Sequence, residues 1–183
     1  MALWMLRHMA AARVDGIGIV DVRGRNDSFT RIISQALHLV RDHDPRRYKR
    51  IVRHIAWIVN EFCHSQGLEY NSRTRIVSFE FPEFEGLDEN LLIALCACGL
   101  VHEATHGVIS SRGILYEGDN RSGIESLCMI EQNRFVKRLA QADPVRYPIE
   151  LLHIEFNETD WKPGWTTNRL KKAVHLISRA LTS

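Results

Sequence analysis

One long apolar segment that contains two histidines constrains the fold of this chain more than any other feature. Residues 89–111 read ENLLIALCACGLVHEATHGVISS, with an aspartate directly before them and a glycine shortly after. Aspartate favours a helix start and glycine a helix end, so we predict one long helix over about 88–112. Its first turns are apolar on all sides, which predicts burial. The same buried helix must therefore accommodate His102, Glu103 and His106.

The spacing of these three residues predicts a metal site. His102 and His106 are four positions apart, so both lie on one helix face, where two imidazoles can bind one zinc ion. Glu103 adjoins the first histidine and can take a proton from a water that the metal acidifies. This is the H-E-x-x-H pattern. The alternative is a polar helix rim, but unpaired polar groups are costly in a buried helix, which favours the metal.

A catalytic zinc needs a third protein ligand, with one position left open. A second helix, expected over about 122–141, should return antiparallel and bring its early turns level with the histidines. Glu125 lies in those turns, between the small residues Gly123 and Cys128, which we expect to let the two helices approach closely. The acidic candidates are Glu117, Asp119, Glu125 and Glu131. We select Glu125.

Two alternatives to this assignment stay open. Ser122 and Glu125 fit a capping box, in which Glu125 would serve the helix start rather than a metal. Glu131 is the reserve ligand, although it lies nearly two turns further along and about 240° around the helix.

The pattern of HEATHG at 102–107 followed by IESLC at 124–128 resembles the gluzincin metallopeptidases. Within that group it is most similar to the ImmA/IrrE-type peptidases. The resemblance covers only residues 95–139. It implies a zincin-like fold with Glu103 as the general base and Cys128 at the small-residue position behind the third ligand. The implied ligands of its single zinc ion are His102, His106 and Glu125.

The whole chain, 1–183, is expected to be one zincin-like metallopeptidase domain. It is α+β and mostly helical, with a small sheet and an H-E-x-x-H active-site helix. Strands are expected within 16–24 and 73–84, and Pro82 limits the second to a sheet edge or a strand end. Segment 150–156 is ambiguous. Further helices are expected over 27–43, from Pro45 to before Gly67, and over 166–181.

Several residues outside the motif are candidates for supporting roles. The group that stabilises the developing oxyanion is left open among Tyr116, Tyr147, His153 and Arg134, with His153 more typical of a core histidine. The segment RIVSFEF, 75–81, is the best candidate for an edge strand that binds an extended peptide. Cys98 lies one turn before His102, but its size favours core packing.

Two surface features are interpreted structurally. The basic residues of the helix expected from Pro45 are interpreted as a solvated helix face rather than a phosphate-binding site. Trp161 and Trp165 favour a packed turn over a partner site. The basic residues are Arg46, Arg47, Lys49, Arg50 and Arg53.

Composition and charge bear on nucleic-acid binding, on the location of the protein and on membrane insertion. The 183 residues are 45% apolar and 25% charged, with a net charge of +2, so nucleic-acid binding is not favoured. The four cysteines form no regular framework, which favours reduced thiols and a cytoplasmic location. We find no signal peptide, and we expect no run that approaches the roughly 18–20 apolar residues of a membrane span.

The sequence therefore predicts a zinc-dependent metallopeptidase that acts on a specific peptide or protein substrate through Glu103. The alternative is a non-catalytic, zinc-containing regulatory or protein-interaction module. The substrate, the oligomeric state, and any export or activation are left open.

Overall fold

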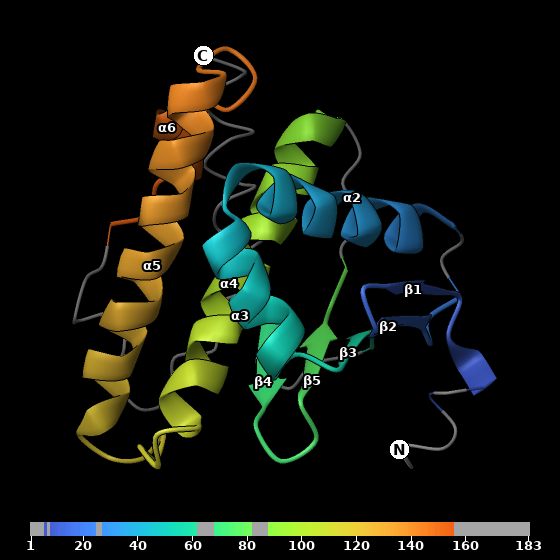
Figure 1. Cartoon of the computed structure of the whole chain (residues 1–183), viewed down its shortest axis with the longest axis vertical. Helices are drawn as coiled ribbons and strands as arrows, with labels where there is room; N and C mark the ends of the chain where they lie inside the picture. The colour runs from blue at the N-terminus through green and yellow to red at the C-terminus, as the bar shows by residue number, and fades with distance from the viewer. Residues whose placement is uncertain (1–5, 7, 25–26, 62–67, 82–87, 156–183) are drawn as a thin grey trace.

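The computed structural model describes residues 6, 8–24, 27–61, 68–81 and 88–155. Within these residues the chain forms five helices and one five-stranded sheet, which confirms the expected α+β class (Figure 1). The helix expected over 166–181 lies outside the described residues, as do Trp161 and Trp165. The elements are β1 (Ala12–Val14), β2 (Ile17–Asp21), α2 (Asp27–His43), α3 (Pro45–His54), β3 (Trp57–Asn60), β4 (Leu68–Asn71), β5 (Ile76–Phe79), α4 (Glu89–Ser110), α5 (Asn120–Ala142) and α6 (Ile149–Leu152).

The sheet has the strand order β1-β2-β3-β5-β4. Its three central strands are parallel, and the two edge strands, β1 and β4, run antiparallel to their neighbours. Ile19, Ile58 and Val77 are paired across the central strands and belong to the main core. Val20 and Val59 point to the other face and pack in a smaller cluster. Both faces of the central strands are therefore buried, as is usual for parallel strands.

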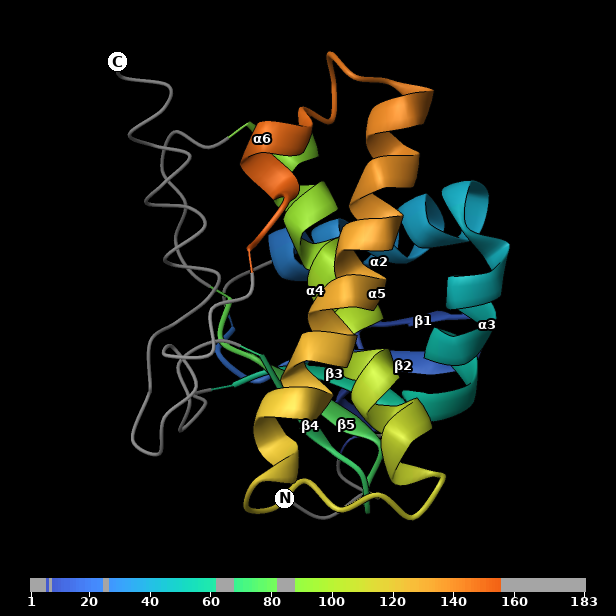
Figure 2. The ribbon, with the colours of Figure 1, turned by 90° about the vertical axis from the view of Figure 1, so that its left-hand side faces the viewer.

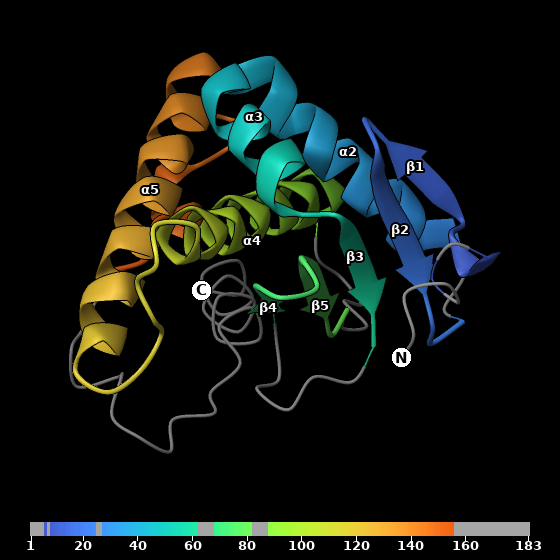
Figure 3. The same cartoon turned by 60° about the horizontal axis from the view of Figure 1, so that its bottom comes forward.

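The helices cover the face that carries the main core. Figure 3 shows α2, α3 and α4 on the same side of the sheet, with α5 beside α4. In α2 the apolar residues predicted at helical spacing are all buried. These residues are Phe29, Ile32, Ile33, Ala36, Leu37 and Val40.

The helix expected from Pro45 to before Gly67 is wrong beyond its third turn. Asp44 caps it as predicted, accepting a hydrogen bond from the Arg47 backbone N–H at 3.1 Å. However, α3 ends at His54, and the chain then enters β3, whose four residues are all buried. A central parallel strand is apolar on both faces, so its side chains continued the apolar pattern of the preceding helix.

The long helix α4 is the centre of the fold, in contact with α2, α3, α5 and β4. By length and composition alone it could span a membrane, contrary to the expectation from the sequence. However, 83% of its most apolar 18-residue window is buried inside the protein. This burial is that of a core helix, so the apolar character of α4 is explained by packing.

Candidate metal centre

The helix α4 begins and is buried as its sequence predicts. The Asp88 carboxylate accepts a hydrogen bond from the Leu91 backbone N–H at 3.0 Å, which caps the first turn. His102 and Glu103 are only 2% and 6% exposed. Two ionisable side chains thus lie in a long, apolar and mostly buried helix, where they need specific partners.

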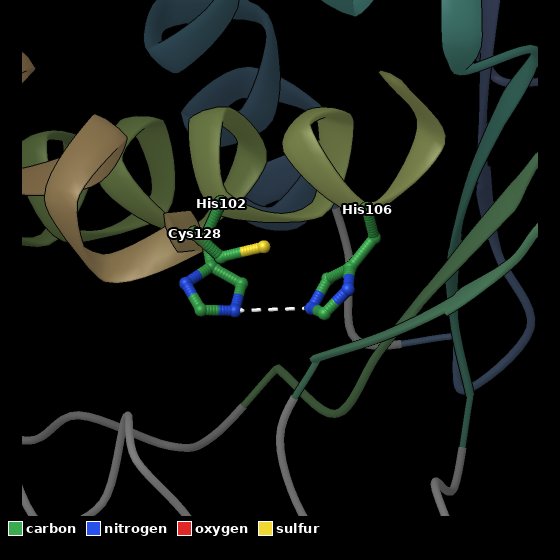
Figure 4. Close-up of side chains that lie close together, drawn as sticks. All are labelled: His102, His106 and Cys128. Atoms are coloured by element: carbon green, nitrogen blue, oxygen red, sulfur yellow. Dashed lines mark hydrogen bonds between the residues drawn. The ribbon is translucent and has the colours of Figure 1, made fainter. Parts of the chain in front are cut away.

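The two histidines of α4 point toward one another. Their Nε2 atoms lie 3.2 Å apart, and their ring centroids 5.0 Å apart. Figure 4 shows the rings of His102 and His106 on the same side of the helix, one turn apart. This arrangement follows directly from the four-residue spacing.

The carboxylate of Glu125 lies against both histidines. The helix α5 runs antiparallel to α4 (Figure 2), and Glu125 in its second turn is 2% exposed. Its Oε2 lies 3.2 Å from the Nε2 of His102, and its Oε1 lies 3.5 Å from the Nε2 of His106. Donors bonded to one tetrahedral zinc at about 2.0–2.2 Å are roughly 3.4 Å from each other. The three side chains therefore have the spacing that a shared metal ion requires.

The two competing interpretations of this acidic region are not supported. The helix α5 begins at Asn120, and its N-cap residue makes no side-chain capping bond, so Ser122 and Glu125 form no capping box. Glu131 instead forms ion pairs with three arginines. Its carboxylate is thus committed to a different site. The N–O distances are 3.0 Å to Arg47, 2.6 Å to Arg50 and 2.6 Å to Arg134.

The close approach of α5 was predicted from two small residues, Gly123 and Cys128, and only Cys128 lies between the helices. Gly123 is exposed, and an added Cβ there would meet nothing within 4 Å. Cys128, by contrast, is fully buried and packs with Ile109 of α4 and Ile124. Small size matters at position 128 and not at position 123.

Cys128 also brings a further donor atom to the histidines. Its Sγ and one ring nitrogen of each histidine all lie within 4.8 Å of one another. Figure 4 shows the sulfur beside the two rings. His102, His106 and Cys128 could therefore hold a metal ion. Cys98 lies outside this group, and burial raises the pKa of its thiol to about 12, so it fits the predicted core role.

Glu103 lies on α4 near Tyr70 of β4. The pKa of Tyr70 in β4 is raised, mainly because its side chain is buried. The charge of Arg75 lowers this pKa, and the charge of Glu103 raises it. The Tyr70 hydroxyl donates a hydrogen bond to the His54 backbone carbonyl at 3.0 Å. A Cβ at Gly107 would come within 2.6 Å of the His54 Cβ, so α4 needs glycine there for this approach. Glu103 is thus placed next to a sheet edge.

Among the four candidates for oxyanion stabilisation, Tyr116 is the one found at the histidines. Its hydroxyl donates a hydrogen bond to Glu125 Oε1, and its ring lies edge-on to His106 with centroids 5.3 Å apart. Burial and the hydrogen bond to Glu125 raise the pKa of Tyr116 to about 12. The guanidinium of Arg121 lies 4.9 Å above its ring.

The other three candidates have other surroundings. Arg134 pairs with Glu131, and Tyr147 packs against His43. His153, expected in the core, is exposed instead. Its segment forms the short helix α6 and then extended chain, so it does not point inward.

The strand expected to bind a peptide is not an edge strand. The segment 75–81 contains β5, which is paired on both sides, with β3 and with β4. The true edge on this side of the sheet is β4, and no other described strand pairs with its outer side. Leu68 and Tyr70 of β4 lie where Cβ atoms on Gly99 and Gly107 of α4 would meet them. The edge strand therefore borders the histidine helix.

The basic face of α3 is only partly solvated. Arg47 is 7% exposed and forms ion pairs with Asp44 and Glu131, and Arg50 also binds Glu131. These contacts hold α3 to α5. Two of the five cations are therefore structural, which weakens any role in phosphate binding.

No protein-family model, no curated protein and no solved structure matches the chain.

Proposed function

We propose that this chain is a zinc-dependent metallopeptidase. The observation that carries the proposal is the convergence of His102, His106 and Glu125 at mutual distances of 3.2–3.5 Å. Two imidazoles and one carboxylate are a donor set typical of catalytic zinc, which leaves one position open. Glu103, directly after the first histidine, completes the pattern of ligands and general base.

Each residue of the centre has a distinct role in this proposal. Zinc, when bound, supplies the Lewis acidity that acidifies water and polarises a carbonyl group. Glu103 takes the proton from the attacking water and returns it to the leaving amine. Tyr116 donates a hydrogen bond to the carbonyl oxygen as negative charge develops there, since its hydroxyl already lies beside Glu125.

The substrate is proposed to be an extended peptide that pairs with the outer side of β4. Backbone groups on a sheet edge are available for this pairing, and β4 borders α4 at Gly99 and Gly107. Glu103 lies near this strand, since its charge contributes to raising the pKa of Tyr70 in β4.

Elemental analysis of the purified protein tests the metal first. We expect about one zinc per chain in the wild type and in Glu131→Ala, and a large loss in Glu125→Ala. Glu131→Ala is a matched control because it removes a carboxylate from the same helix, six residues away. Wild-type protein that takes up no zinc when it is supplied refutes the proposal.

A second variant tests catalysis separately from binding. Glu103→Gln should retain zinc and lose turnover of quenched fluorescent peptides by roughly 10²–10⁴-fold, the contribution of a general base. Full activity in this variant would exclude the mechanism, even if the metal is present.

One observation favours a second candidate, a non-catalytic zinc-containing module. Cys128 adds a possible fourth donor, and four protein donors are typical of structural zinc sites. In that case removal of the metal should unfold the domain, because the binding energy of a structural site is folding energy. A chelated protein that stays folded by circular dichroism and recovers activity with zinc supports the enzyme instead.

A further inference from the structure

We propose that Cys128 is a fourth protein donor of this centre, and that its thiolate fills the position that a catalytic zinc keeps open. The inference rests on the proposed metal centre and adds a latent state to it. The peptidase would then be inactive until the thiolate leaves the metal.

The position of Cys128 on its helix supports this inference. It follows Glu125 by three residues, so both side chains lie on the face of α5 that packs against α4. Its Sγ is within 4.8 Å of a ring nitrogen of His102 and of His106. The side chain is fully buried, so its sulfur faces the histidine helix and not solvent.

The chemistry of the four groups also supports it. Thiolate sulfur is a strong zinc ligand, with bonds of about 2.3 Å, and a metal held by the imidazoles would be within reach after a small side-chain movement. A metal also favours the deprotonated thiol, so binding would release a proton from Cys128. A buried thiol whose only role was packing would need no imidazole nitrogen beside it.

The contact between Tyr116 and Glu125 indicates how the donor set can change. Glu125 Oε1 accepts a hydrogen bond from the Tyr116 hydroxyl and lies near His106. This hydrogen bond from the α4–α5 connection can thus hold Glu125 in place when the Cys128 thiolate leaves the fourth position. The site can then open by a side-chain movement of Cys128, without any movement of the backbone.

Cobalt(II) in place of zinc tests the inference without any substrate. The cobalt-loaded wild type should show a near-ultraviolet thiolate-to-metal charge-transfer band together with visible d–d bands. Cys128→Ala should lose the charge-transfer band, keep d–d bands, and bind cobalt more weakly by on the order of tenfold or more. Cys128→Ser is the second variant, in case the alanine chain does not fold. Cys98→Ala is the matched control: it removes another fully buried thiol and should keep the band.

Acetohydroxamic acid tests whether the thiolate closes the site. This small metal-binding molecule should perturb the d–d bands of Cys128→Ala and leave those of the wild type unchanged. Cobalt binding without a charge-transfer band in the wild type overturns the role of Cys128 and leaves the proposed peptidase intact. If the wild type shows the charge-transfer band but its d–d bands still change with the hydroxamate, Cys128 is a donor and the site is not closed. This result keeps the sulfur ligand and overturns the proposed latency. A wild type that binds no cobalt overturns both proposals.

Discussion

Replacement of Gly107 by alanine tests how closely α4 is held to its neighbours beside the candidate metal centre. The added Cβ would lie 2.6 Å from the Cβ of His54 and 3.0 Å from the Tyr70 hydroxyl oxygen. The nearer atom is attached directly to the backbone of α3, so it cannot rotate away. Either α3 or the last turns of α4 must shift.

The expected free energy follows from two opposing contributions. Alanine is favoured over glycine in a helix by up to about 1 kcal/mol. Overpacking of a tight contact costs about 1–3 kcal/mol. Gly123→Ala in α5 gains the helix propensity of alanine without any overpacking, because its Cβ would meet nothing within 4 Å. The difference between the two variants therefore isolates the cost of the close contact, about 1–3 kcal/mol.

Urea unfolding followed by circular dichroism measures this difference. Gly123→Ala should match or exceed the wild type in stability, and Gly107→Ala should be less stable than Gly123→Ala. In a chain of this length, each kcal/mol lowers the melting temperature by roughly 2–4 °C. If the two variants agree within about 0.5 kcal/mol, the packing of α4 against His54 is not as described, and the placement of Glu103 near β4 loses its support.

Three further predictions concern Tyr116 and the ion pairs that hold α3 to α5. Tyr116→Phe should keep its zinc and lower kcat by roughly 100-fold with little change in KM, as measured with fluorescent peptides. Arg47→Met should reduce the unfolding free energy by roughly 3 kcal/mol in urea, because it leaves the buried Asp44 carboxylate without its main cation. Burial alone would raise the pKa of Glu131, but Arg134, Arg47 and Arg50 outweigh it, so the pKa lies below its ordinary value. The Glu131 carboxylate stabilises the fold fully above its unfolded-state pKa, and this stabilisation is lost as the pH falls through its lowered folded-state pKa. Glu131→Gln should therefore flatten the acid side of a curve of stability against pH.

The histidine pair could be predicted from the sequence because its geometry is local. Four residues make about one helical turn, so the spacing of His102 and His106 determines their relation wherever the helix packs. The prediction of Glu125 needed one further assumption, that the next helix returns antiparallel to the first. A nine-residue connection between α4 and α5 is short enough to favour such a return. The position of Cys128 was also accessible, since it is three residues after Glu125. Its small size was used in the prediction, but its sulfur was not considered as a donor.

The sheet could not be predicted to the same degree, since strand order depends on contacts between distant residues. Ile58 and Val59 lie at positions that also fit a helical stripe, and only pairing with β2 and β5 makes them a strand. β4 is four residues long and alternates between half-buried and exposed side chains, which is too short a signal. Without β4, the segment containing β5 was taken for the edge. The error concerned which strand forms the edge of the sheet, and the positions of His102, His106 and Glu125 were unaffected.

The energetic cost of the centre favours a binding role over a purely structural one. His102 and Glu103 of the apolar helix α4, and Glu125 of α5, are each at least 94% buried. Apolar residues of similar volume often stabilise a core as well as buried ionic groups do, so stability alone gives no reason to keep three such groups together. A metal ion changes this balance, since it binds the deprotonated donors and adds its binding energy to the folded state. The rigid helices α4 and α5 hold the donors, whereas Tyr116 lies on the exposed connection between them. The donors are thus fixed by two packed helices, and Tyr116 is the most solvent-exposed residue at the candidate centre.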